Sequence, residues 1–169
     1  MALSMYQAAV PGILRMLHSL SAILDKAQTM VSARKWEDAK LLDARLFPDM
    51  FPLARQIQSV SDNAKGIIGR LSGSEAPSMP DTETTIADLK ARLTKTAEFI
   101  NSIHPSKFDG AETRTVSLPV GGGNKIELAG PDYLFLQGLP NFYFHATTAY
   151  DILRHCGLEV GKRDYLGAR

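Results

Sequence analysis

Apolar residues recur at three- and four-residue steps over four long segments of this 169-residue chain. That spacing places them on one face of an α-helix, so each segment is predicted to be helical. The helices are expected at about residues 4–27, 36–71, 82–103 and 131–155. Helices with one apolar face must bury it, and a chain of this length can form a core of its own. The sequence therefore predicts an all-α protein, a four-helix bundle that forms a single domain over residues 1–169.

Prolines and glycines modify this pattern. Pro11 lies inside the first segment, which predicts either a bend there or a helix that starts late enough to place Pro11 in its first turn. Pro48 and Pro52 interrupt the second segment, and we expect a helix bent at both, because each removes a backbone donor. Gly157 is expected to end the last helix, and the tail at 162–167 is expected to be irregular.

The apolar period changes between the third and fourth helices. Residues 115–120 and 124–128 alternate between apolar and polar side chains, as in β-strands, and the triglycine 121–123 lies between them. These residues predict a short β-hairpin. The triglycine is not expected to bind phosphate, because no helix N-terminus follows it. An isolated hairpin is only marginally stable in water, so this one must pack against the helices.

Charge and cysteine content restrict the classes of partner. Nineteen basic and eighteen acidic residues give a formal net charge of +1, which offers no basic face for nucleic acid. The sequence has no run of eighteen apolar residues, so no membrane span is expected. The N-terminus has no positive charge before Arg15, which favours a helix over a signal peptide. The single cysteine, Cys156, cannot form an internal disulfide, and we predict a cytoplasmic protein.

Polar residues interrupt the apolar faces of the second and fourth helices. At about 100° per residue, they share those faces with apolar neighbours, and they are Arg45, Asp49, Gln56 and Asn63 on the second helix and Asn141, His145, Thr148 and His155 on the fourth. If the two faces meet in the core, Asp49 and Gln56 approach the group on the fourth helix. The candidates for ligand binding are therefore Asp49, Gln56, Asn141, His145 and Thr148. Two interpretations stay open: a hydrogen-bonded network that fixes helix register, or an active or ligand-binding site.

The other histidines and the cysteine have structural explanations. His18 is expected at the surface, and His104, before a proline, at a helix end. His155 lies near a helix C-terminus, where the helix dipole favours a cation. Cys156 has no activating partner in the sequence and is predicted to be a small buried apolar residue.

An aromatic run, Phe142-Tyr143-Phe144, covers most of the circumference of the fourth helix. A helix that is apolar on several sides is usually buried on several sides. We expect Phe144 to pack in the core, and Tyr143 to be the better candidate for a contact with a second subunit.

Two stretches of the sequence resemble a known family, namely ARLFPDMFPL at residues 44–53 and LPNFYFHATTAY at residues 139–150. Met5-Tyr6, the triglycine and GKRDYLG at residues 161–167 are similar to it as well, so the resemblance covers nearly the whole chain. The family is the bacterial domain-of-unknown-function family nineteen ninety-three, within the DinB/YfiT-like superfamily of candidate metalloenzymes. The resemblance implies a four-helix bundle of the up-down-down-up type, with the hairpin between helices 3 and 4, and a homodimer.

The resemblance also implies a metal site, from which this sequence departs. The superfamily typically holds a divalent metal, often nickel or zinc, with three histidines, one from the second helix and two from a pair four residues apart. Some relatives are thiol-transferases that use mycothiol or bacillithiol. Here the second helix has no histidine, and Asp49 is its nearest inward-facing candidate. His145 has Asn141 four residues before it and Ala149 four residues after it. We therefore expect no three-histidine site and no cofactor, and Asp49, Asn141 and His145 are weak candidates for a harder divalent metal.

Three hypotheses of function follow. The leading one is an uncharacterised DinB-like bundle protein with a polar core pocket around Asp49, Gln56, Asn141 and His145, which can bind a small molecule. The alternative is an enzyme, a metal-dependent hydrolase or thiol-transferase, in which His145 and Asp49 position a metal-bound water or thiolate. The third is a structural or stress-related homodimer. Whether the protein is an enzyme stays open between these hypotheses.

Overall fold

Long helices make up most of residues 3–167, the part of the chain that the computed structural model describes. The four longest are α1 (Met5–Arg34), α3 (Leu53–Ser72), α4 (Ile86–Ser102) and α6 (Leu139–His155). The shorter ones are α2 (Ala39–Leu42), the 3-10 helix η1 (Pro105–Phe108), α5 (Gly130–Asp132), the π-helical turn η2 (Tyr133–Gly138) and α7 (Lys162–Leu166). The strands β1 (Thr115–Pro119) and β2 (Lys125–Ala129) form a small two-stranded antiparallel sheet.

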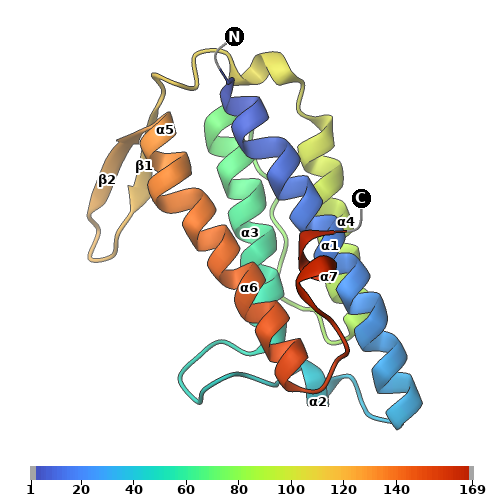
Figure 1. Ribbon diagram of the computed structural model, residues 1–169. Coiled ribbons are helices and arrows are strands. Elements are labelled where there is room, and N and C mark those ends of the chain that lie inside the picture. Colours follow the sequence, from blue (N-terminus) through green and yellow to red (C-terminus); the bar gives the residue numbers. More distant parts are fainter. Residues whose placement is uncertain (1–2, 168–169) are drawn as a thin grey trace.

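The four long helices enclose the apolar core. α3 packs against α4 and α6, and α1 also packs against α4 and α6 (Figure 1). Their inward faces supply fully buried side chains, among them Ile13, Leu20, Ile57, Leu93 and Phe142. Burial of such side chains is the main term that favours folding. Among the described residues, no helix combines the length and the apolar character needed to cross a membrane.

The first helix begins as its apolar pattern predicts but continues further, to Arg34. The Ser4 hydroxyl accepts a hydrogen bond from the Gln7 N–H (3.2 Å), and Gln7 Oε1 accepts one from the Ser4 N–H (3.1 Å), so a capping box starts the helix. Pro11 lies inside the helix and not in its first turn, so a late start is wrong. Because Pro11 is on the exposed side, water can satisfy the carbonyl that it leaves without a donor.

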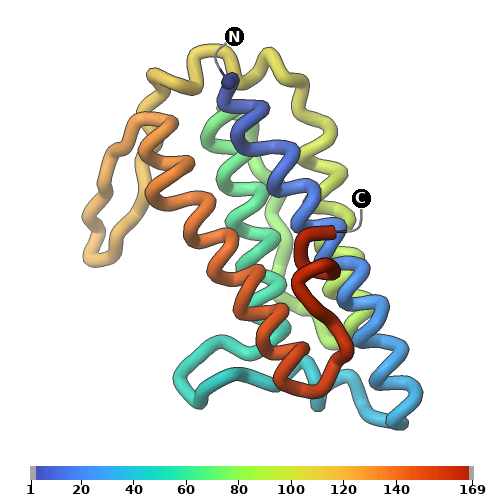
Figure 2. The backbone as a smooth tube through the Cα atoms, in the orientation of Figure 1, coloured from blue at the N-terminus to red at the C-terminus, as the bar shows by residue number. Residues whose placement is uncertain are grey.

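The predicted helix over residues 36–71 is wrong in its first half. Only the short α2 is helical there, and residues 43–52 form a loop at the end of the molecule opposite the N-terminus (Figure 2). A hydrogen bond from the Leu53 N–H to the Ala44 carbonyl oxygen (2.9 Å) closes the loop. Two prolines four residues apart therefore end the helix instead of bending it, because each removes a donor and crowds the preceding turn. Pro52 directly precedes α3 as its N-cap.

The hairpin and the last long helix follow the prediction more closely. β1 and β2 pair over their full lengths, and Val116 is buried against the helices. α5, η2 and α6 follow one another without a gap, and Gly157, at φ 86°, lies just beyond their end. The π-helical turn in between ends at Gly138, where a Cβ would lie only 2.9 Å from Ile67 Cγ1. The helix changes its period where its backbone packs closely against Ile67 of α3.

The tail, predicted to be irregular, contains the short helix α7. The Gly161 N–H donates to Asp164 Oδ2 (2.8 Å) at its start, and Lys26 Nζ donates to Asp164 Oδ1 (2.6 Å). Arg15 Nε donates to the Leu166 carbonyl oxygen (2.6 Å), so α7 lies on α1 (Figure 1). A five-residue helix is too short to show an apolar period, and these contacts with α1 stabilise it where the local sequence alone would not.

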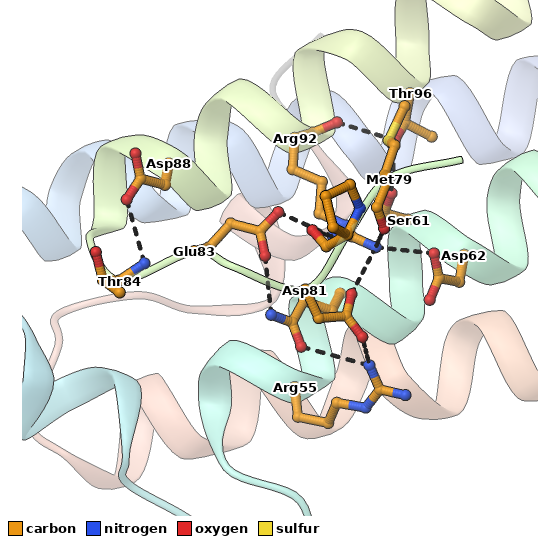
Figure 3. A network of polar contacts seen from close by, with 12 residues as sticks. Arg55, Ser61, Asp62, Met79, Asp81, Glu83, Thr84, Asp88, Arg92 and Thr96 are labelled. Carbon is orange, nitrogen blue, oxygen red and sulfur yellow. Dashed lines mark hydrogen bonds and ion pairs between the residues drawn. The ribbon is translucent and has the colours of Figure 1, made fainter. Parts of the chain in front are cut away.

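A buried arginine connects α4, α3 and the segment between them (Figure 3). The Arg92 side chain is 2% exposed, and its guanidinium pairs with Asp62, Asp81 and Glu83, each at 2.9 Å. Asp81 pairs with Arg55 as well, so one carboxylate lies between two guanidinium groups. A charge taken out of water needs partners of this kind. The network therefore holds the segment between α3 and α4 against both helices.

Candidate functional site

A histidine–glutamine pair connects α6 and α3. His145 Nδ1 lies 2.7 Å from Gln56 Oε1. Gln56 is 1% exposed and His145 is half-buried. The pair forms because the apolar faces of the two helices meet: Ile57 on α3 and Ala149 on α6 are fully buried beside it. The approach of Gln56 to His145 that the helical spacing predicted is therefore present.

The Gln56 side chain determines which nitrogen of the ring carries the proton. Gln56 Nε2 donates to the Phe51 carbonyl oxygen (3.1 Å), which leaves Oε1 facing the histidine. A carbonyl oxygen can only accept, so His145 Nδ1 carries the proton and donates it. In the neutral ring Nε2 then has a free lone pair, and no residue within 3–167 donates to it. Nε2 can accept a hydrogen bond or a proton, or coordinate a metal.

Two phenylalanines flank the His145 ring. Phe51 stacks on it, with 6.4 Å between the ring centroids and 14° between the ring planes. Phe144 meets it edge-on, with 5.3 Å between the centroids. The two phenylalanines are 50% and 56% exposed. A polar acceptor between half-exposed aromatic rings suits a ligand with a flat apolar body and one donor group.

The surroundings keep His145 neutral. Burial lowers the pKa of His145, and the positive charge of Arg55 lowers it further. Arg55 is held near the ring, because its guanidinium lies 5.6 Å from the Phe51 ring centroid and pairs with Asp81. The imidazole is therefore present in the form that accepts a hydrogen bond.

A second polar pair connects the same two helices, about one turn from His145 along α6 and about two turns from Gln56 along α3. Asn141 Nδ2 donates to Asn63 Oδ1 (2.8 Å), and Asn63 Nδ2 donates to the Ser59 carbonyl oxygen (2.8 Å). Asn141 is exposed, so this pair lies at the rim of the helix contact. Thr148 is buried, but its hydroxyl donates to the Phe144 carbonyl oxygen of its own helix (2.8 Å). The threonine hydroxyl is thereby satisfied within α6.

The helical spacing predicts Arg45 and Asp49 on the inward face of a helix, and this prediction is wrong. Both are exposed in the loop 43–52. Arg45 Nη1 donates to the Met50 carbonyl oxygen (3.3 Å) and so supports the loop. The Asp49 carboxylate has no hydrogen bond or ion pair with the rest of the described chain. The helical spacing that set Asp49 beside Gln56 does not apply, because the prolines end the helix between them.

The donor set does not fit the three-histidine metal centre that the resemblance implied. Within residues 3–167, no three side chains of His, Cys, Asp or Glu gather closely enough to hold a metal ion. At His145, the donor that α3 places nearby is the Gln56 amide, whose oxygen is already bonded to the imidazole. Nickel and zinc sites in proteins are built from several imidazole, thiolate or carboxylate donors.

Sequence reasoning missed the aromatic part of this site. Phe144, expected in the core, is 56% exposed, whereas Phe142 is fully buried. The buried face of α6 steps from Phe142 to Ala146 and Ala149. A helix with that inward face turns Phe144 outward, and this spacing was already present in the sequence. Phe51 had no such signal, because it lies in the loop.

The remaining reactive side chains lie outside this site. His18 and His155 are exposed, as expected for His18. His104 lies at a helix end, as predicted: it is the N-cap of η1, and its Nδ1 accepts a hydrogen bond from the Ser106 N–H (3.3 Å). Cys156 is half-buried, and burial raises the pKa of its thiol, which keeps it protonated.

Comparison with known proteins identifies the family. The family model described as "Domain of unknown function (DUF1993)" matches residues 5–166. A crystal structure of a DinB family member protein from Shewanella denitrificans is similar over 97% of this chain and 92% of that chain, with 40% sequence identity and a TM-score of 0.90. No curated protein matches the chain. The chain therefore belongs to the DUF1993 family and is a DinB-like protein.

Proposed function

We propose that this DinB-like four-helix-bundle protein binds a small molecule at His145, without the three-histidine metal centre of its superfamily. The observation that supports this most is the 2.7 Å hydrogen bond between His145 and Gln56. It uses Nδ1 and leaves Nε2 as an acceptor. The ligand is a flat molecule with one hydrogen-bond donor, because the acceptor lies between Phe51 and Phe144.

A purely structural polar pair is the competing explanation. In such a pair the buried polar atoms are satisfied within the protein. Gln56 meets that condition, since both ends of its amide are bonded. His145 differs, because its second nitrogen has no donor within residues 3–167 and its two aromatic neighbours are half exposed. This difference favours a binding role for the histidine and a positioning role for the glutamine.

The metal-dependent hydrolase or thiol-transferase needs Asp49 beside His145. The exposed position of Asp49 in the loop 43–52 does not favour that arrangement. The homodimer also stays a prediction. Tyr143, its expected contact, lies half-buried against α1, since a Cβ on Gly12 would be 3.1 Å from the Tyr143 hydroxyl. Sedimentation velocity at micromolar concentration checks the oligomeric state.

Phenol is a suitable probe, because it has a flat ring and one donor. NMR titration of the untagged protein should show binding with a Kd on the order of millimolar, as expected for so small a ligand. His145→Ala should weaken binding about tenfold, which is the loss of one hydrogen bond in a partly buried site. His18→Ala is the matched control, since His18 is an exposed histidine on α1, and it should leave the Kd unchanged.

The same untagged protein, incubated with Ni²⁺ or Zn²⁺ and dialysed, should retain no stoichiometric metal by elemental analysis. One bound metal ion per chain that is lost in His145→Ala would contradict the proposal and support the enzyme alternative. Phenol binding that is equal in wild type and His145→Ala would contradict it as well, and would leave the pair as a structural bond.

A further inference from the structure

A groove of about 1380 Å³ runs along α1 beside α7. Its floor is mostly apolar, with Met16 and Ile23 buried and Leu14 half-buried on α1. Tyr143 of α6 forms part of its wall. His145 does not line the groove, so it is separate from the site described above.

Positive charges border this groove. Arg15, Lys26 and Arg163 line it. Among the described lining residues, the one carboxylate is that of Asp164, and it is already paired with Lys26 at 2.6 Å. The border therefore carries uncompensated positive charge.

Arg15 is the most strongly oriented of these cations. Its Nε donates to the Leu166 carbonyl oxygen (2.6 Å) and its Nη2 to the Gly167 carbonyl oxygen (3.3 Å). Both partners are neutral, so they fix the guanidinium without cancelling its charge. Arg163 has no hydrogen bond or ion pair from its side chain to the rest of the described chain. Both guanidinium groups line the groove, and each can donate charge-assisted hydrogen bonds to an anion.

We propose that this groove binds a small amphiphilic carboxylate, with its head group at Arg15 and Arg163 and its apolar chain over Leu14 and Met16. The groove offers cationic groups to the head of the ligand and apolar side chains to its chain. Guanidinium groups form charge-assisted hydrogen bonds with a carboxylate, and burial of each methylene against the apolar floor adds to the affinity. Because the overall charge is only +1, the net charge of the protein adds little attraction, and the affinity for the carboxylate depends on the cations in the groove.

Octanoate is the probe, and 1-octanol, with the same chain length and no charge, is its matched comparison. In isothermal titration calorimetry, octanoate should bind the full-length protein at least tenfold more tightly than 1-octanol. Arg15→Gln should weaken octanoate binding about tenfold, the equivalent of one charged hydrogen bond. Because Arg15 also holds α7, Arg163→Gln is the second variant, and it should weaken binding about threefold with the fold intact by circular dichroism.

Lys125→Gln is the charge-matched control, because Lys125 lies on the hairpin, away from α7 (Figure 1). It should leave octanoate binding unchanged, as should His145→Ala. Equal affinity for octanoate and 1-octanol, or equal loss in Arg163→Gln and Lys125→Gln, would overturn the proposal. Sedimentation that shows self-association through this groove, lost in Arg163→Gln with no octanoate binding at all, would overturn it in favour of a second copy of the chain.

Discussion

Replacing Arg92 with alanine is expected to lower the free energy of unfolding by about 3 kcal/mol, because it leaves Glu83, a largely buried carboxylate, without its cation. Asp62 and Asp81 are 39% and 38% exposed and can return to water, but Glu83 is only 11% exposed. The cost therefore comes mainly from Glu83 and from the lost bond of Arg92 to the Pro80 carbonyl oxygen (3.1 Å). Urea unfolding followed by circular dichroism measures the change.

Lys90→Ala is the matched control for this variant. Lys90 lies half a turn before Arg92 on α4 and pairs with Asp25, which is 62% exposed. Pairs of this kind contribute about 0–1 kcal/mol, since water screens them. If Arg92→Ala costs no more than Lys90→Ala, the network does not hold the segment between α3 and α4.

The Arg92 network also makes stability depend on pH in a defined direction. Burial alone would raise the pKa of Glu83, but hydrogen bonds from Arg92 and Gln58 outweigh it, so the pKa of Glu83 lies below its ordinary value. The stability that Glu83 contributes is present above the ordinary carboxyl pKa and is lost as the pH falls through the lowered value. Glu83→Gln should therefore reduce the loss of stability on acidification.

Gly130→Ala is expected to destabilise the protein by about 3 kcal/mol, the upper range for forcing an extra carbon into a packed interior. Gly130 is buried at the start of α5, and a Cβ there would overlap the carbonyl oxygen of Ala111. The backbone of Ala111 cannot rotate away as a side chain can, so the segment that carries Ala111 must shift relative to α5. Thermal and urea unfolding both report the change.

Gly161→Ala is the control for that substitution. Gly161 has φ −140°, which any residue adopts, and no atom lies within 4 Å of a Cβ built on it. Its replacement should change stability by less than about 0.5 kcal/mol. Equal effects of the two substitutions would mean that the close approach of Gly130 to Ala111 does not limit the packing.

Helical periodicity predicted α1, α4 and α6 because their apolar faces continue without interruption. It failed over residues 36–52, where Leu42 and Leu46 continue the apolar step but Pro48 and Pro52 end the helix. Periodicity reports which face a residue would have in a helix, and it cannot report whether the helix forms. The short α7 was missed for a related reason, since its stability comes from contacts with α1.

The same distinction explains the candidate site. Gln56 and His145 were predicted together because both lie on helices that form, and the structure brings them to 2.7 Å. Asp49 was predicted from the same spacing but lies in the loop. Phe51 reaches His145 from that loop, and no one-dimensional pattern relates a loop residue to a helix across the core.

The neutral state of His145 makes the stability of the fold depend on pH. Burial and the charge of Arg55 lower the pKa of His145, so on acidification the unfolded chain takes up a proton before the folded one does. The stability from this group is fully present above the ordinary histidine pKa and decreases as the pH falls toward the lowered value.

Long-range ¹H–¹⁵N NMR of the histidine side chains tests the proposed site most directly, because it reports the protonation of each ring nitrogen. For His145 at neutral pH, we expect a protonated Nδ1, an unprotonated Nε2, a pKa below the ordinary histidine value, and no change of the Nε2 signal on addition of Zn²⁺ or Ni²⁺. A proton on Nε2 in place of Nδ1, or a stoichiometric metal-induced shift of Nε2, would contradict the assignment of His145 as a metal-free acceptor oriented by Gln56.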